Sequence, residues 1–238
     1  MGQGMDLSIL LLAKNEAENL EILIPEVKSI AEKSALRYEI VLVDAGSDDG
    51  SEQVCRKNGV RFLVQSRPGF GVALAEGIKA CTGERILTMD CDLQHDPKAI
   101  PRMLRTHADV VIGSRWAGGN AAHASIARMI LSLATNAVFS KLLMIHIRDM
   151  SSNFRLYKRR VLERMQIEAT NFDALEEVLV KCVIQGCTVV EVPITFRKRA
   201  MGVSKVDLSK FFLSFAMTLI RAIRIKATQS SQPLRVHG

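Results

Sequence analysis

The stretch ERILTMDCDLQHDP, residues 84–97, decides how the first half of this chain is read. Its apolar run ends in three carboxylates that fall within seven positions, from Asp90 to Asp96. Like charges this close repel one another, so the cluster needs a cation, a hydrogen-bond network or an exposed surface. Because the carboxylates directly follow an apolar run, we expect them at the end of a buried strand.

Short apolar runs alternate with helical patterns on both sides of this stretch. The expected strands lie at residues 7–13, 38–44, 60–65, 84–90 and 108–115, and the expected helices at 17–32, up to about 58, 69–83 and from 97 onward. This alternation is typical of an α/β fold with a Rossmann-like, mostly parallel sheet and helices on both faces. Ligands of such sheets bind at the carboxyl ends of strands, where Asp44, Asp90 and Arg115 fall.

The second half of the chain has a different pattern. The segments expected there are an apolar helical stretch at 122–147, a helix at 174–185, a strand at 187–196, a basic amphipathic helix at 206–227 and a disordered tail at 228–238. The apolar run inside the last helix, residues 211–220, is shorter than the roughly 20 residues that span a membrane. That helix could lie in a membrane interface or dock on the core. We therefore expect one domain at 1–205 followed by the helix and the tail.

Charge is distributed unevenly along the 238 residues. The net charge is +7, yet residues 195–238 alone carry +8 and residues 1–194 come to −1. A basic end of this kind suits nucleic acid, anionic lipid or a phosphorylated substrate. The five cysteines show no CxxC spacing, and no N-terminal signal sequence is visible, so we expect reduced thiols in a cytosolic protein.

The acidic cluster separates into two parts. Asp96 precedes Pro97 and a helical run, which predicts a helix N-cap. Asp90, Asp92 and Gln94 remain, and in extended backbone alternate residues project to one side. Three oxygen donors so placed suit a hard divalent ion such as Mg²⁺ or Mn²⁺. A D-x-D sequence alone is a weak motif.

Several motifs together resemble inverting family 2 glycosyltransferases, most closely the dolichol-phosphate mannosyltransferase branch. The D-x-D-L-Q-H stretch after an apolar strand resembles the metal-binding motif of that family. The supporting segments follow the family's order: KNEAENL (14–20), VLVDAGSDDGS (41–51), VIGSRW (111–116), RDMSSNFRLYKR (148–159) and FRKRAMGVSK (196–205). The resemblance runs from about residue 7 to residue 210 and implies a GT-A fold.

The resemblance also implies roles for individual residues. The positions expected to contact the nucleotide sugar are Leu12, Lys14, Glu16, Leu42, Asp44, Asp90, Cys91, Arg115, Arg199 and Lys205. Of these, Leu42 and Cys91 would contribute backbone atoms. Asp92 and Gln94, together with Asp90, would ligate Mg²⁺ or Mn²⁺. Asp92 and Arg115 are the expected catalytic residues, and Arg128 and Ser132 are expected at the acceptor phosphate.

The chain departs from the family pattern at four positions. Leu12 and Lys14 stand where Pro and Tyr are usual, and Ala45 replaces the second Asp of V-D-D. These three lie in the implied nucleoside pocket, so the resemblance leaves the base, guanine or uracil, open. Asn153 replaces the Gly before F-R. Asn tolerates the left-handed backbone that a Gly can require.

The resemblance implies metal-dependent, inverting transfer of a sugar to a polyprenyl or dolichyl phosphate, with mannose from GDP-mannose as the expected donor. It also implies a peripheral enzyme on the cytoplasmic face of a membrane, with a membrane-anchoring partner as a further possibility. Each residue also has a structural explanation: Glu16 can favour a helix dipole, Asp44 can stabilise a turn, and Arg115 can be a surface charge.

Three other functions are alternatives to this transferase. The nearest is a family 2 transferase that uses another donor, such as UDP-glucose, or a soluble acceptor. A nucleotidyltransferase usually carries a Gly-rich basic loop early in the chain, and LLLAKNEAEN (10–19) is not one. A nucleic-acid-binding protein would explain the basic end, but no nucleic-acid-binding motif is visible, so we expect no nucleic acid partner.

Overall fold

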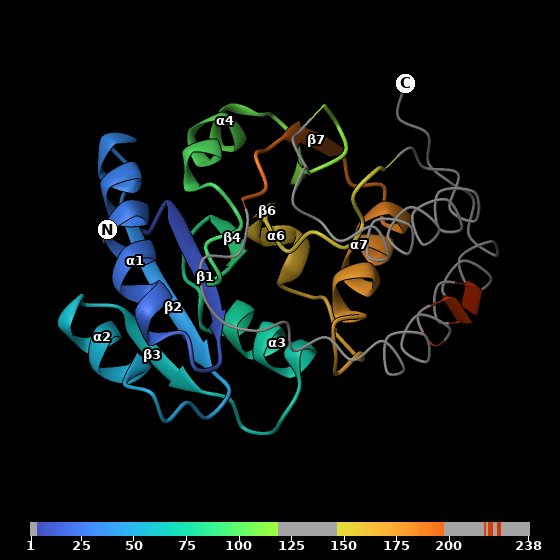
Figure 1. The fold of residues 1–238 in the computed structure, drawn as a ribbon. Helices are drawn as coiled ribbons and strands as arrows, with labels where there is room; N and C mark the ends of the chain where they lie inside the picture. Colours follow the sequence, from blue (N-terminus) through green and yellow to red (C-terminus); the bar gives the residue numbers. More distant parts are fainter. Residues whose placement is uncertain (1–3, 119–146, 198–216, 218, 221–222, 225–238) are drawn as a thin grey trace.

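The computed structural model describes residues 4–118, 147–197, 217, 219–220 and 223–224. Within these residues the chain forms a seven-stranded sheet (Figure 1). In spatial order its strands are β3 (Arg61–Val64), β2 (Tyr38–Asp44), β1 (Leu7–Ala13), β4 (Arg85–Asp90), β6 (Arg155–Lys158), β5 (Val110–Ser114) and β7 (Val189–Pro193). Neighbouring strands are parallel except at β6, which runs antiparallel to β4 and β5. The carboxyl ends of the other strands therefore meet at one edge, beside the start of β6.

Helices cover both faces of the sheet. Side chains alternate along β1, so that Ile9 and Leu11 face one way and Leu10 the other. The face of Ile9 is covered by α1 (Ala17–Lys33), α2 (Ser51–Lys57) and α4 (Ile100–Arg105). The face of Leu10 is covered by α3 (Phe70–Ala80), α6 (Arg159–Leu162) and α7 (Ala174–Ile184). Coverage on both sides explains the continuous apolar strands and confirms the predicted α/β architecture.

Strand β6 is the one described strand that the sequence pattern did not predict. It is four residues long and alternates between the two cores: Leu156 packs on the α1 side and Tyr157 on the α7 side. Four residues containing two cations are too few and too polar to stand out as a buried strand. The sheet is therefore mixed at this point.

The helix predicted after Asp96 begins as expected. The Oδ1 atom of Asp96 accepts a hydrogen bond of 3.0 Å from the backbone N–H of Lys98. A single 3₁₀ turn, η1 (Pro97–Ala99), starts there and leads directly into α4. This confirms Asp96 as an N-cap, and it separates that carboxylate from Asp90 and Asp92.

Some predictions concern residues outside those described. These are the helix at 122–147 apart from its last residue, the disordered tail at 228–238, most of the helix at 206–227, and the site residues Arg128, Ser132, Arg199 and Lys205. Among the described residues, no helix has the length and apolar character needed to cross a membrane. The five cysteines are all free thiols.

Candidate active site

The ends of three adjacent strands bring the predicted nucleotide-sugar residues to one edge. Leu12 of β1 lies in register between Val43 of β2 and Asp90 of β4, and Ala13 is in register with Asp44. Glu16 lies at the N-cap position of α1, just beyond the end of β1. The edge is therefore acidic, as expected where strands of a parallel sheet end in carboxylates.

The D-x-D segment is a turn, not the extended backbone that the sequence suggested. Asp90 is the last residue of β4, and Leu93 adopts a left-handed conformation with φ of 61°. The Oδ1 atom of Asp92 accepts a hydrogen bond of 3.2 Å from the backbone N–H of Gln94. Asp90 and Asp92 are thus brought together by an Asx-type turn rather than by strand alternation. Asp92 is 9% exposed.

Asp90 has partners from two other segments. The Nδ2 atom of Asn153 donates to its Oδ1 at 2.9 Å, and His95 Nδ1 lies 3.6 Å from its Oδ2. The His95 ring stacks on Phe154 with centroids 5.3 Å apart. Burial raises the pKa of the Asp90 carboxyl and the charge of Asp92 raises it further, whereas His95, Asn153 and Arg115 act in the opposite direction. The φ of Asn153 is not positive, so a left-handed backbone does not explain why Asn occupies this position. Its side-chain amide, which bonds Asp90, gives it a role instead.

A divalent metal such as Mg²⁺ is bound in proteins by oxygen atoms, which the side chains of this turn can supply. No group of three or more His, Cys, Asp or Glu side chains in the described part of the chain is arranged to hold a metal. Two carboxylates and an amide are present, from Asp90, Asp92 and Gln94. Mg²⁺ commonly uses one or two carboxylates and takes further ligands from substrate phosphates. The residues fit a metal that a substrate diphosphate also binds.

The start of the FRKR segment packs against this turn. His95 and Phe196 form an isolated antiparallel β-bridge, and the backbone N–H of Arg197 donates to the carbonyl of Gln94 at 2.8 Å. The Nε2 atom of Gln94 donates in return to the carbonyl of Arg197 at 3.3 Å, and Arg197 also pairs with Asp96 at 2.8 Å. The segment that leads to Arg199 therefore begins beside the D-x-D turn.

Asp44 is bonded within its own turn. Its carboxylate accepts hydrogen bonds from the backbone N–H groups of Gly46 and Ser47 at 2.8 and 2.7 Å and from the Ser47 hydroxyl. It is 2% exposed. Turn chemistry therefore accounts for the hydrogen bonds that the Asp44 carboxylate makes among the described residues.

Glu16 and Cys91 lie close to each other. Glu16 Oε2 accepts a hydrogen bond of 2.6 Å from Asn19 Nδ2. Burial raises the pKa of the Cys91 thiol well above its usual value, and the charges of Glu16, Asp90 and Asp92 add to this effect. The charge of Glu16 therefore acts on the D-x-D turn, although the two are more than 70 residues apart in sequence.

The remaining positions differ in exposure. Lys14 is exposed and Leu12 is half-buried, so both reach the surface at the edge of the sheet. Leu42 is fully buried inside β2, where it is in register with Leu11 and Phe62. It lies two residues before the strand ends.

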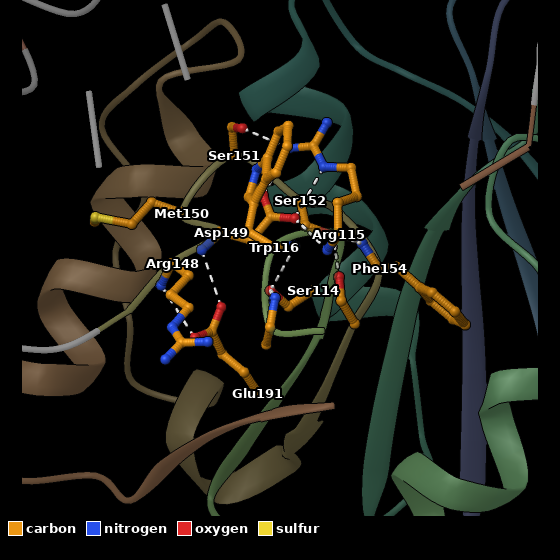
Figure 2. Close-up of polar contacts among 12 residues, drawn as sticks. Ser114, Arg115, Trp116, Arg148, Asp149, Met150, Ser151, Ser152, Phe154 and Glu191 are labelled. Atoms are coloured by element: carbon orange, nitrogen blue, oxygen red, sulfur yellow. Dashed lines mark hydrogen bonds and ion pairs between the residues drawn. The ribbon is translucent and has the colours of Figure 1, made fainter. Parts of the chain in front are cut away.

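Arg115, just after β5, is held by a buried carboxylate (Figure 2). Asp149 accepts from its backbone N–H at 2.8 Å, from Nε at 2.9 Å and from Nη2 at 2.6 Å. Nη2 also donates to the Ser151 hydroxyl at 2.8 Å. Asp149 is 0% exposed. The guanidinium lies over the rings of Trp116 and Phe196, 5.8 and 5.2 Å from their centroids. Arg115 is therefore not a surface charge.

Strand β7 holds the loop that carries Asp149. The carboxylate of Glu191 accepts hydrogen bonds from the backbone N–H groups of Arg148 and Asp149 at 3.0 and 2.9 Å (Figure 2). Further along, the Ser152 hydroxyl donates to the carbonyl of Gly113 at 2.8 Å. No sequence pattern predicted these side-chain contacts of Asp149, Asn153 and Glu191. The first two lie in the RDMSSNFRLYKR motif, which was the available signal.

The fold and this edge define the GT-A class of glycosyltransferase. The structure is similar to that of glucosyl-3-phosphoglycerate synthase from Mycobacterium tuberculosis in complex with Mn²⁺, UDP and glucosyl-3-phosphoglycerate. The TM-score is 0.70 at 17% identity, covering 97% of this chain and 82% of that one. A structure of the same enzyme with Mg²⁺ and UDP gives a TM-score of 0.70 at 17% identity, over 97% and 81%.

The chain belongs to glycosyl transferase family 2, whose family model matches residues 8–166. It is 32% identical to the dolichol-phosphate mannosyltransferase of Pyrococcus furiosus, over 87% of this chain and 61% of that protein. It is 31% identical to the polyprenol monophosphomannose synthase of Mycolicibacterium smegmatis, over 81% and 78%. It is 30% identical to the dolichyl-phosphate hexose transferase of Haloferax volcanii, over 85% and 87%. The family resemblance seen in the motifs is confirmed, and this chain spans 61% of the Pyrococcus relative.

Proposed function

We propose that this chain transfers a sugar, with inversion, from a nucleotide sugar to a polyprenyl or dolichyl phosphate, and that the donor is GDP-mannose. The observation that carries the proposal is 30–32% identity, over more than four fifths of the chain, to three relatives named for polyprenol or dolichol phosphate products. The acidic turn after β4, beside Arg115, supports the same chemistry.

The donor is assigned to the edge formed by β1, β2 and β4. Its nucleoside would contact Leu12, Lys14, Glu16, Asp44 and the backbone at Leu42 and Cys91. Mg²⁺ or Mn²⁺ would be held by Asp90, Asp92 and Gln94, and the chemistry that such an ion supplies is neutralisation of charge on the leaving diphosphate. Asn153 supports this assignment because its amide fixes the orientation of the Asp90 carboxylate.

Cations are assigned to the phosphates of the two substrates. Arg115 donates from Nε and Nη2 to protein groups, and its Nη1 has no hydrogen-bond partner among the described residues. We assign Nη1 to a phosphate oxygen. Arg199 and Lys205 are proposed for the donor or acceptor phosphates, and Arg128 and Ser132 for the acceptor phosphate.

In the proposed reaction an acceptor phosphate oxygen attacks the anomeric carbon, the bond from that carbon to the diphosphate breaks, and the nucleoside diphosphate leaves. A phosphate monoester has a second pKa of about 6 and is already anionic near neutral pH, so it needs no strong general base. Its requirement is positioning beside the donor in a site whose cations offset repulsion. The fixed Arg115 serves this purpose.

A membrane surface, on its cytoplasmic side, is the proposed location because the proposed acceptor is a lipid. Within the helix predicted at 206–227, the described residues Met217, Ile220 and Ile223 are helical and 46–47% exposed. Their three-residue spacing places them on one side of the helix, while Leu219 packs against the core. Exposed apolar residues on a basic helix suit a membrane interface.

The transfer proposal is tested with the full chain, radiolabelled GDP-mannose, a polyprenyl phosphate and Mn²⁺ or Mg²⁺. Label should enter the organic phase, and Asp92→Ala should reduce the rate by at least about 1,000-fold. Glu21→Ala, which removes an exposed carboxylate from α1, is the matched control and should retain activity. Label from UDP-glucose alone would contradict the donor assignment. Label only in a water-soluble product would contradict the acceptor, and no transfer from any sugar nucleotide would contradict the proposal as a whole.

The membrane proposal has its own test, flotation with anionic vesicles. Ile220→Glu should reduce the bound fraction, whereas Ile22→Glu, an equally exposed isoleucine on α1, should not. Equal losses for the two variants, or no binding by the unmodified chain, would contradict it.

A further inference from the structure

Two cysteines meet at the turn between α7 and β7. The backbone N–H of Gly186 donates to the carbonyl of Val183 at 3.0 Å, and that of Cys187 donates to the carbonyl of Cys182 at 3.0 Å. Gly186 has a left-handed φ of 76°. These two bonds and the left-handed glycine form a Schellman motif, in which the first and last side chains of the six-residue turn pack against each other. In this chain both of those side chains are thiols.

The two cysteines of this turn differ in burial. Cys182 belongs to the buried core on the α7 side of the sheet, and Cys187 packs against that core. Cys182 is fully buried, whereas Cys187 is half-buried and its neighbours Gly186 and Thr188 are exposed. A partly exposed thiol therefore lies at one end of this turn and a buried thiol at the other.

The charges around Cys187 favour its thiolate. Interaction with the Cys182 thiol lowers the pKa of Cys187 to about 7, and Arg160 and Lys158 act in the same direction. Burial and the carboxylate of Asp109 oppose this shift without cancelling it. A lowered pKa increases the thiolate fraction at neutral pH and makes Cys187 a nucleophile.

The other cysteines provide an internal contrast. Burial raises the pKa of Cys55 to about 11 and that of Cys81 to about 12, and it raises the pKa of Cys91 well above its usual value. All three are buried. Cys187 is therefore the one cysteine of the five that is partly exposed and has a lowered pKa.

We propose that Cys182 and Cys187 are a redox-active thiol pair, which a peroxide oxidises to a disulfide across the α7–β7 turn. The Cys187 thiolate attacks one peroxide oxygen, the O–O bond breaks and hydroxide leaves, giving a sulfenic acid. The Cys182 sulfur then attacks the Cys187 sulfur, the S–O bond breaks and water leaves. Overall two thiols and one hydrogen peroxide give one disulfide and two waters.

The position of the pair suits this chemistry. The 3.0 Å backbone bond already holds the two residues together, so closing the disulfide needs movement of the side chains rather than of the chain. The turn leads into β7, whose Glu191 holds the loop of Asp149. The proposed bond would tie α7 to the strand that supports the candidate active site.

The first test counts thiols in the full, reduced chain before and after treatment with hydrogen peroxide. Denaturing alkylation and mass spectrometry should show a fall from five free thiols to three, with Cys182 and Cys187 joined to each other by a disulfide. Cys55→Ala should still lose two thiols. Cys182→Ser should form no disulfide, and its Cys187 sulfenic acid should be trapped by dimedone. Retention of all five thiols, or a disulfide between other cysteines, would overturn the proposal.

A second measurement needs no variant. Limited alkylation of the unmodified, native chain near neutral pH should label Cys187 at least about 100-fold faster than Cys55 or Cys81, because only Cys187 is an accessible thiolate. Peptide mapping gives the rate at each position. Equal rates at these cysteines would show that Cys187 is not activated.

Discussion

The carboxylates of Asp44 and Asp92, at the ends of β2 and β4, are bonded within their own turns, whereas the carboxylate of Asp149 is bonded to a distant segment that follows β5. Asp44 and Asp92 accept hydrogen bonds from residues two or three positions further along the chain. Asp149 binds Arg115, 34 residues away, and its own backbone N–H is held by Glu191, 42 residues away. The turns of Asp44 and Asp92 can form locally, but the Arg115–Asp149 pair needs the assembled sheet.

The difference also concerns charge. The turn at Asp44 satisfies a carboxylate with backbone N–H groups and a hydroxyl, whereas Arg115 and Asp149 are two opposite charges that depend on each other. Removing one member of a buried ion pair leaves the other uncompensated. We therefore expect the β5–β6–β7 side to be more sensitive to substitution and to pH than the side formed by β1, β2 and β4.

The largest expected effect comes from breaking the buried pair. Asp149→Asn should lower the free energy of unfolding by about 3–5 kcal/mol, because the Arg115 guanidinium loses its counter-charge. The matched change Asp44→Asn should cost only about 1 kcal/mol, since an amide oxygen still accepts from the turn. Urea unfolding of both variants measures the difference. Equal costs would contradict the contrast between the two sides.

A pH effect of intermediate size is expected at Glu176 in α7. Burial raises its pKa to about 7, with Asp173 and Asp149 adding to the effect and Arg155 opposing it. The unfolded value is about 4.3, so the folded state holds its proton more tightly and loses this stability as pH rises through about 7. The unfolding free energy should fall by about 2–3 kcal/mol between about pH 5 and pH 8.

Glu176→Gln should abolish this decrease, whereas Glu163→Gln, at an exposed glutamate after α6, should leave it in place. Urea unfolding across the pH range measures both. A decrease that persists in Glu176→Gln would assign it to another group.

The opposite pH dependence is expected at Asp109, before β5. Burial acts to raise its pKa, but hydrogen bonds from Thr188, Lys158 and Arg160 outweigh burial and hold the pKa well below its usual range. This stability is present above the unfolded value of about 3.9 and is lost as pH falls below it.

Asp109→Asn should therefore cost about 1–2 kcal/mol near neutral pH and progressively less as the solution becomes acidic. Urea unfolding at a series of pH values, compared with the unmodified chain, measures the gap between the two. A gap that stays constant on acidification would contradict this account.

The smallest expected effect joins the two sides of the site. Asn153→Ala removes the donor to Asp90, 63 residues away, and should weaken binding of GDP with Mn²⁺ by about 3–10-fold, the typical net value of one hydrogen bond. Asn171→Ala, at an exposed asparagine, is the control. Calorimetric titration gives the affinities. An unchanged affinity in Asn153→Ala would show that Asp90 needs no such support.

Local patterns in the sequence determined most of the sheet and the position of the D-x-D turn. The strand at residues 84–90 and the N-cap at Asp96 follow from apolar period and from capping chemistry, which act over a few residues. The family motifs added the residues of both sides of the site, including the segment that contains Asp149.

Only the tertiary structure decided which of these residues contact each other. Strand β6 enters the sheet antiparallel, Leu93 turns the D-x-D segment out of extended backbone, and Asp149 binds Arg115 while Glu191 fixes its loop. Apolar periodicity encodes which face of an element is buried. The partner of a buried charge depends instead on the register between segments that are far apart in the chain, and the sequence near either residue does not contain that register.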